Sequence, residues 1–198
     1  MKNYYRELPD GYALYKEIDA KSIKTVIIMN LVATLMMIAV IVPLIIFYLV
    51  PEGAFDDDKV QLGTLSWFLI IFFGGYIGYI VLHELTHGAA YKILTGEKLT
   101  FGFTVSVAFC GLKEGFVNKR TALISILAPF VLFTLIFGAL IIFLPPNLIS
   151  TAVCILFACH VGGCAGDLYG TLVLLGAPKD VLMCDTGPKQ SFYSQREN

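Results

Sequence analysis

Three long stretches of the sequence contain no charged residue. They cover residues 25–51, residues 60–82 and residues 121–166. A helix needs about 20 apolar residues to cross the hydrocarbon core of a bilayer, so the third stretch, with 46 residues, has room for two crossings. Pro145 and Pro146 near its middle are typical of a turn between them. The pattern predicts four transmembrane helices, over residues 25–50, 64–92, 121–144 and 148–176.

The segment between the second and third predicted helices has a different period. In residues 99–110, large apolar side chains occupy the odd positions and small side chains occupy the even positions. A period of two is typical of a strand with one buried face. Gly111 and Gly115, followed by Phe116 and Val117, favour a hairpin here. The strand is then either part of a structural cap at the membrane interface or an edge that can pair with an extended peptide.

The composition agrees with a membrane protein. Hydrophobic residues make up 57% of the chain and charged residues only 15%, whereas an ordinary soluble domain is about 25% charged. The net charge of −1 does not offer the basic face that a nucleic-acid partner requires. We therefore expect contact with membrane lipid and no nucleic-acid partner.

The lysines and arginines set the expected orientation. Five lie in residues 1–24, one in residues 51–63, five in residues 92–120 and three after the fourth helix. With four crossings, 13 of the 14 fall on one side, and the positive-inside rule makes that side cytoplasmic. The predicted fold class is an α-helical membrane protein with four transmembrane helices and a short cytoplasmic β-hairpin between helices 2 and 3. The predicted parts are a cytoplasmic N-terminal segment (1–24), a four-helix membrane domain (25–176) and a cytoplasmic tail (177–198).

One motif carries most of the candidate chemistry. His83, Glu84 and His87 form an HExxH motif near the cytoplasmic end of the second predicted helix. Side chains at i and i+4 leave the same face of a helix, so the two imidazoles can hold one metal ion. Glu84 is placed to act as a general base on a water molecule rather than to bind the metal. A charge within a membrane helix is costly and usually functional. The alternative is that these residues are only polar groups at a helix end.

A third metal ligand should come from elsewhere in the chain, because catalytic zinc normally takes three protein ligands and leaves one position open. The fourth predicted helix offers His160, Cys164 and Asp167 on one face. Counted from the outer ends of their helices, His83 and Asp167 both lie about 19 residues in, or about 28 Å deep. His160 would lie about 10 Å nearer the membrane centre. We therefore favour Asp167 and keep His160 and Cys164 as alternatives.

At these residues the chain resembles known families. An HExxH motif in a transmembrane helix, followed by a strand-like cytoplasmic loop and an intramembrane aspartate, is similar to site-2-protease-type intramembrane metalloproteases. More closely, the chain resembles a family of small bacterial membrane proteins described as "putative zincin peptidases", over most of residues 60–195. The features shared with that family are His83-Glu84-Leu85-Thr86-His87-Gly88, Ala128-Pro129, Gly166-Asp167-Leu168, Asp185-Thr186-Gly187 and Phe192-Tyr193.

The resemblance implies a zinc metalloprotease. In site-2 proteases two histidines and an aspartate bind zinc and the glutamate is the base, which carries over to His83, His87, Asp167 and Glu84. Their aspartate precedes a glycine, whereas here Gly166 precedes Asp167. The resemblance also implies a location in the bacterial cytoplasmic membrane and a protein or peptide substrate, itself a membrane protein.

Two functions of different classes follow. The favoured one is a zinc-dependent, membrane-embedded peptidase that cleaves a peptide bond in or near the cytoplasmic side of the membrane. The alternative is a non-enzymatic membrane protein that binds metal as a sensor or scaffold. A metal or proton transporter fits less well, because the outer halves of the predicted helices carry no relay of ionisable residues.

Overall fold

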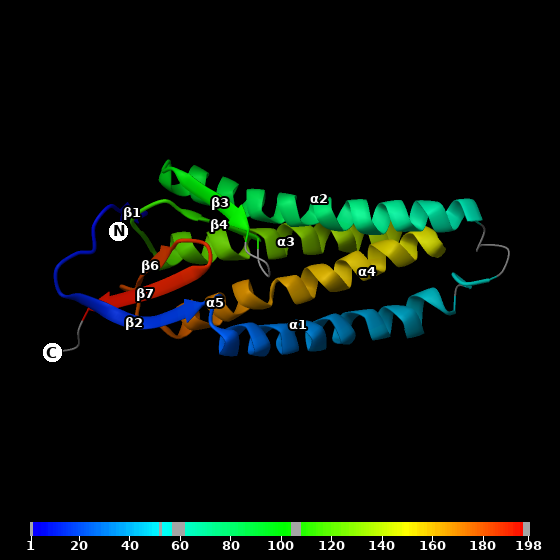
Figure 1. The fold of residues 1–198 in the computed structure, drawn as a ribbon, viewed down its shortest axis with the longest axis horizontal. Coiled ribbons are helices and arrows are strands. Elements are labelled where there is room, and N and C mark those ends of the chain that lie inside the picture. Colours follow the sequence, from blue (N-terminus) through cyan, green and yellow to red (C-terminus); the bar gives the residue numbers. More distant parts are fainter. Residues whose placement is uncertain (1, 52, 57–61, 104–107, 196–198) are drawn as a thin grey trace. The chain divides into compact units, whose positions relative to one another are not determined.

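The structure is a computed structural model that describes residues 2–51, 53–56, 62–103 and 108–195. Helices account for most of these residues, and seven short strands account for much of the rest (Figure 1). The long helices overlap the charge-free stretches, since a long apolar run favours a helix that satisfies its own backbone hydrogen bonds. Pro43 and Pro129 lie inside two of these helices. The helices are α1 (Ile23–Leu44), continued by a π-helical segment η1 (Ile45–Leu49), then α2 (Leu62–Thr95), α3 (Lys119–Phe143), α4 (Leu148–Gly163) and α5 (Ala165–Gly176).

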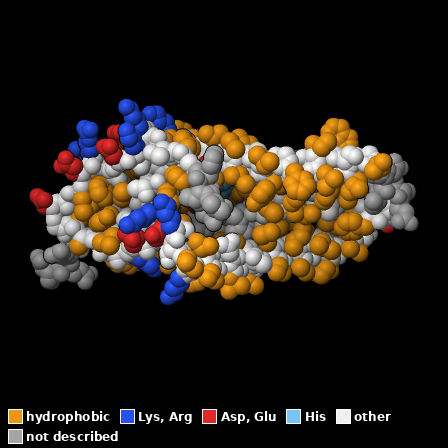
Figure 2. Space-filling model, in the orientation of Figure 1, with side chains coloured by type: hydrophobic (Ala, Val, Ile, Leu, Met, Phe, Trp, Pro, Cys, Tyr) orange, Lys and Arg blue, Asp and Glu red, His pale blue; other side chains and the backbone are white. Residues whose placement is uncertain are grey.

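Four helical stretches are long and apolar enough to cross a membrane. They are Ile23–Leu49, Leu62–Thr95, Lys119–Phe143 and Leu148–Gly176. Large apolar side chains along them are exposed: Phe47 is 79% exposed and Phe143 84%. Figure 2 shows such side chains covering the surface of the helical segments. Exposure of this extent is typical of a surface that contacts lipid, so the prediction of four membrane-length helices is confirmed.

The fourth helical stretch differs from the prediction in one respect. Residues 148–176 were expected to form one helix, but the helix is interrupted at Cys164, between α4 and α5. Gly162 and Gly163 come directly before the interruption, and glycine lowers the stability of a helix interior. The N–H of Cys164 donates to the carbonyl of His160 and ends α4. The interruption gives α5 a first turn of its own, which contains Asp167.

The predicted turn between the third and fourth membrane stretches is stabilised by Asn147. Its side-chain oxygen accepts hydrogen bonds from the N–H groups of Ile149 (2.8 Å) and Ser150 (3.0 Å), and the Ser150 hydroxyl accepts from the N–H of Asn147. This reciprocal arrangement satisfies amide groups that the start of a helix otherwise leaves without partners. Asn147 therefore fixes where α4 begins after Pro145 and Pro146.

The expected hairpin needs a correction. Residues 99–110 are not one strand: β3 (Leu99–Phe103) folds back on β4 (Ala108–Leu112) as an antiparallel pair, with Phe101 opposite Cys110. The expected partner, β5 (Phe116–Asn118), pairs instead with β1 (Tyr4–Tyr5) and β6 (Leu182–Asp185). Val105 and Val107, part of the alternating pattern, lie outside the described residues.

A five-stranded antiparallel sheet joins both terminal segments to the middle of the chain. Its strand order is β1-β5-β6-β7-β2, with β2 spanning Tyr12–Asp19 and β7 spanning Lys189–Gln195. Residues 1–24 and 177–198 were expected to form separate terminal segments, and their pairing was not predicted. β6 and β7 are close in sequence, but β1 and β2 pair with strands from the middle and the end of the chain, and no local pattern indicates such pairing.

The chain divides into two compact units. The first comprises Met1–Met29, Val81–Pro129 and Gly166–Asn198, and it contains both sheets. Its buried core draws side chains from α2, α3, α5 and strands β4–β7. Met183 and Phe192 are paired across β6 and β7 and both are fully buried, and burial of each stabilises the fold by about 1.5–3 kcal/mol.

The second unit comprises Asn30–Ile80 and Phe130–Ala165 and is helical in its described part. One of its core clusters is built from aromatic side chains, with Tyr79, Phe133 and Phe137 packed together. The ring of Tyr79 meets that of Phe133 edge-on at 5.2 Å between centroids. Such edge-on contacts between aromatic rings add to the stability gained by burying their surface.

Asn118 connects three parts of the first unit: β5, the start of α3 and the N-terminal segment. Its side-chain oxygen accepts from the N–H of Thr121 (2.8 Å) at the start of α3, and its amide nitrogen donates to the carbonyl of Lys2 (2.8 Å). We expect Asn118→Ala to lower the free energy of unfolding in detergent by about 1–3 kcal/mol. Asn118→Asp keeps the acceptor for Thr121 and should lose less. Equal losses in the two variants would contradict a capping role.

Candidate active site

The two histidines of the HExxH motif lie on α2 within the first unit. They are separated by about one turn of helix, and their rings meet edge-on with centroids 4.9 Å apart. His83 is 8% exposed and His87 7%. Two buried imidazoles at this spacing, facing the same way, form two of the donors that a metal ion requires.

Asp167 of α5 completes the group. Its Oδ2 lies 3.3 Å from Nε2 of His83, and its Oδ1 lies 3.5 Å from Nε2 of His87. All three ligand atoms lie within 4.8 Å of one another. The first turn of a helix favours a negative charge, because its N–H groups are directed toward it. The structure thus brings together the three residues that the sequence analysis favoured as ligands.

The distances suit zinc. In a tetrahedral zinc site with bonds of about 2.0–2.1 Å, two ligand atoms lie about 3.3–3.4 Å apart. The two carboxylate–imidazole distances, 3.3 and 3.5 Å, are close to that separation, with each imidazole facing a different oxygen of the carboxylate. Two nitrogens and one carboxylate oxygen are also the ligand set of many catalytic zinc sites, which keep a fourth position for water or substrate. The residues present therefore fit a zinc ion.

The ring of His87 is oriented by a hydrogen bond behind it. Its Nδ1 lies 2.8 Å from the backbone carbonyl oxygen of Ser125 in α3. A carbonyl can only accept, so Nδ1 carries the proton and Nε2 presents its lone pair toward Asp167 and the metal position. Metal-binding histidines are commonly held in this way, which fixes the tautomer and raises the basicity of the ligand.

Glu84 is tied to the small hairpin. Its carboxylate lies near the backbone N–H of Cys110 in β4 and interacts with it. Gly88, directly after the motif, lets the hairpin approach α2: a Cβ at this position would lie 2.7 Å from the ring of Phe101 and 3.2 Å from Sγ of Cys110. Burial raises the pKa of the Cys110 thiol to about 12, so this cysteine is a neutral thiol rather than a nucleophile.

A second buried polar group lies one turn further along α2. The hydroxyl of Tyr91 donates to Oδ2 of Asp185 (2.7 Å), and the N–H of Gly187 donates to Oδ1 (2.9 Å). Asp185 is 4% exposed, and burial raises the pKa of its carboxyl group to about 6. This group ties the end of β6 to the helix that carries the histidines.

The alternative ligands belong to the other unit. His160 is fully buried there, with Nδ1 2.9 Å from the Tyr79 hydroxyl and Nε2 3.1 Å from the Thr134 hydroxyl. Sγ of Cys164 lies 3.6 Å from Nδ1 of His160. Both ring nitrogens of His160 are therefore engaged by hydroxyl groups. Phenylalanine rings also surround it: Phe130, Phe133, Phe137 and Phe157.

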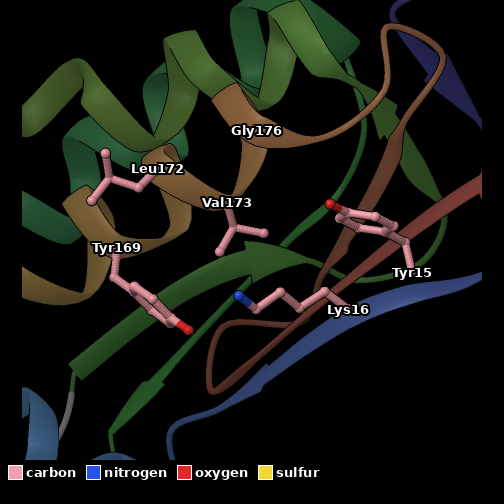
Figure 3. Close-up of a pocket in the computed structure, with 6 residues that line it drawn as sticks. All are labelled: Tyr15, Lys16, Tyr169, Leu172, Val173 and Gly176. Atoms are coloured by element: carbon pink, nitrogen blue, oxygen red, sulfur yellow. The ribbon is translucent and has the colours of Figure 1, made fainter.

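A pocket of about 230 Å³ lies elsewhere in the first unit, between β2 and α5 (Figure 3). The ammonium group of Lys16 lies 5.3 Å from the centre of the Tyr169 ring. The pocket is lined by Tyr15, Lys16, Tyr169, Leu172, Val173 and Gly176, so none of the candidate site residues borders it.

Comparison with known proteins identifies the family. A family model with the description "Putative zincin peptidase" matches residues 76–182, more than half of the 198 residues. The chain belongs to this family, which confirms the closer of the two resemblances; the relation to site-2 proteases stays a prediction. The description indicates a metallopeptidase and implies zinc. No curated protein and no solved structure matches the chain significantly.

Four groups that support the site were not predicted from the sequence. The Ser125 carbonyl and the Cys110 N–H are backbone groups and leave no signal in the sequence. Asp185 was noted only as part of a shared tail motif. Tyr91 lies at i+4 from His87, so the helical spacing that joined the two histidines could also have indicated it.

Proposed function

We propose that this protein is a zinc-dependent peptidase embedded in the bacterial cytoplasmic membrane, with both termini cytoplasmic. The observation that carries the proposal is the contact of both Asp167 oxygens with the imidazoles of His83 and His87, at 3.3 and 3.5 Å. Membership of the zincin family supports peptide-bond hydrolysis. The distribution of lysine and arginine supports the orientation.

The roles of the residues follow from their chemistry. Zinc, when bound, supplies a Lewis acid that lowers the pKa of water and polarises a carbonyl group. His83, His87 and Asp167 hold the ion, and the Ser125 carbonyl fixes the tautomer of His87. Glu84 takes a proton from the attacking water and delivers it to the leaving amine, as a general base and then acid.

The substrate is proposed to be a protein segment in extended conformation. A helix hides its peptide bonds, so a membrane-spanning substrate has to unwind before hydrolysis. Among the described residues β3 pairs only with β4, which leaves its other edge available. The N–H of Cys110 points away from β3, toward Glu84. The N–H of Lys113 donates to the carbonyl of Lys98, so these two residues form a hydrogen-bonded pair across the hairpin. In an antiparallel pair these groups alternate, so Phe101, opposite Cys110, directs its own N–H and C=O toward the free edge.

The position of this edge supports substrate binding next to the catalytic groups. Phe101 and Cys110 both approach α2 at Gly88, directly after His87. A peptide added to β3 gains main-chain hydrogen bonds without a strict sequence requirement. The proposed partners are therefore membrane lipid and an unwound segment of another membrane protein.

The catalytic role of Glu84 is tested by Glu84→Gln in detergent-purified, full-length protein. The amide keeps the size of the side chain but cannot take a proton, and the variant leaves all three ligands intact. We expect about one zinc ion per chain in both proteins, with cleavage of dye-labelled β-casein lowered by at least about 100-fold in the variant.

Two results would count against this mechanism. Undiminished cleavage by Glu84→Gln would show that Glu84 is not the general base. Zinc bound in both proteins, with no cleavage of β-casein or of unwound membrane segments by the wild type, would favour the alternative of a metal-binding sensor or scaffold.

The role of the β3 edge is tested by comparing Phe101→Pro with Phe101→Ala. Both variants lose the ring, and only proline also removes the edge N–H, at a position where an edge strand tolerates it. We expect the proline variant to show a higher KM than the alanine variant, with equal zinc content. Equal KM values would remove strand pairing from the account of substrate binding.

A further inference from the structure

β4 is held on both of its faces. Because side chains alternate along a strand, Cys110 faces one way and its two neighbours face the other. On the first side lies α2, where a Cβ on Gly88 would be only 3.2 Å from Sγ of Cys110. On the second side lies the turn between β6 and β7, where a Cβ on Gly111 would be 2.6 Å from the carbonyl carbon of Thr186 and 2.7 Å from the Asp185 carbonyl oxygen.

The turn is shaped for this contact. Gly187 has a φ of 95°, a conformation that residues with a side chain rarely adopt. A Cβ there would also overlap the ring of Phe109, the other neighbour of Cys110. Two glycines, Gly111 on the strand and Gly187 on the turn, thus let backbone pack against backbone and ring. A side chain at either position would push the turn away from β4.

The same turn is fastened directly to α2. Asp185, at its start, accepts hydrogen bonds from the Tyr91 hydroxyl and the Gly187 N–H. Tyr91 lies four residues after His87 and therefore on the same face of the helix. Three contacts therefore link these elements in a closed circuit. Tyr91 of α2 binds Asp185, the turn after Asp185 packs against β4, and β4 packs against α2 at Gly88.

The side chain of Glu84 needs a contact outside its own helix, because the helix does not fix its rotamer. It follows His83 directly, so its side chain leaves the helix about 100° away around the axis. A glutamate has several rotatable bonds, and holding one rotamer costs conformational entropy. The N–H of Cys110, in the middle of this strand, lies near the carboxylate and favours the orientation that faces it.

We propose that the Asp185–Gly187 turn is a positioning element for Glu84: it presses β4 against α2 and so fixes the Cys110 N–H that holds the carboxylate. The inference rests on the proposed function, since a fixed carboxylate matters only if Glu84 acts as the base. It gives the C-terminal hairpin a role in catalysis although the hairpin touches neither the ligands nor the reacting groups among the described contacts.

The test compares zinc-loaded, full-length wild type with Gly111→Val, Asp185→Ala and Asp185→Asn. Lys189→Met is the matched control, because Lys189 begins β7 beside the turn but pairs with Glu17 of β2, 2.8 Å away. Three quantities are measured: hydrogen exchange of the Cys110 amide at residue level, zinc per chain, and kcat and KM on dye-labelled β-casein.

We expect Gly111→Val and Asp185→Ala to speed exchange of the Cys110 amide at least about tenfold, because the strand opens locally more often. Zinc content and KM should stay at wild-type values while kcat falls. Asp185→Asn keeps an oxygen for one of the two donors and should recover part of both kcat and the protection. Lys189→Met should match the wild type throughout.

Unchanged exchange at Cys110 in both Gly111→Val and Asp185→Ala would overturn the proposal, and so would loss of zinc in parallel with kcat. Asp185→Asn, which keeps the side-chain size, still tests the proposal if Gly111→Val or Asp185→Ala prevents folding. A wild type that binds no zinc refutes the proposed function instead. The two failures are therefore distinguishable.

Discussion

The candidate site depends on a carboxylate that reaches two imidazoles presented by one helix. His83 and His87 are fixed by their spacing on α2, so the third donor has to come to them. Asp167 meets that requirement with a separate oxygen for each ring, 3.3 and 3.5 Å away. The interruption at Cys164 places Asp167 in the first turn of α5, where its charge is stabilised by the helix N-terminus.

Around this group, the short strands and their turns provide backbone groups that the middle of an apolar helix cannot provide. Helices in lipid can present side chains to one another, but in the middle of a helix the backbone N–H groups are bonded to the helix's own carbonyls, so α2 offers none to orient Glu84. β4 provides one at Cys110, and β3 provides an unpaired edge among the described residues. The terminal segments of the chain complete the support, since β6 and β7 carry the turn that packs against β4.

Long charge-free runs made the helices predictable, because length and hydrophobicity alone decide whether a helix can cross a bilayer. The grouping of His83, His87 and Asp167 was predictable for a related reason: positions i and i+4 put the two histidines on one face of a helix, and equal depth in two helices favoured Asp167 as their partner. The alternation over residues 99–110 misled, because a hairpin reverses the faces: odd positions of β3 pack on α2, whereas Phe109 and Gly111 of β4 face the C-terminal turn. The five-stranded sheet could not be predicted as a whole, since β1 and β2 pair with β5 and β7, which lie far away in the sequence.

The most direct measurement is the zinc content of detergent-purified wild-type protein beside Asp167→Ala, protected from chelators. The account predicts about one zinc ion per wild-type chain and a clear loss in the variant, because removing one of three protein ligands lowers the affinity strongly. Equal zinc in both proteins would contradict it and move the third ligand to His160 or Cys164. Absence of zinc from both would contradict the metallopeptidase itself.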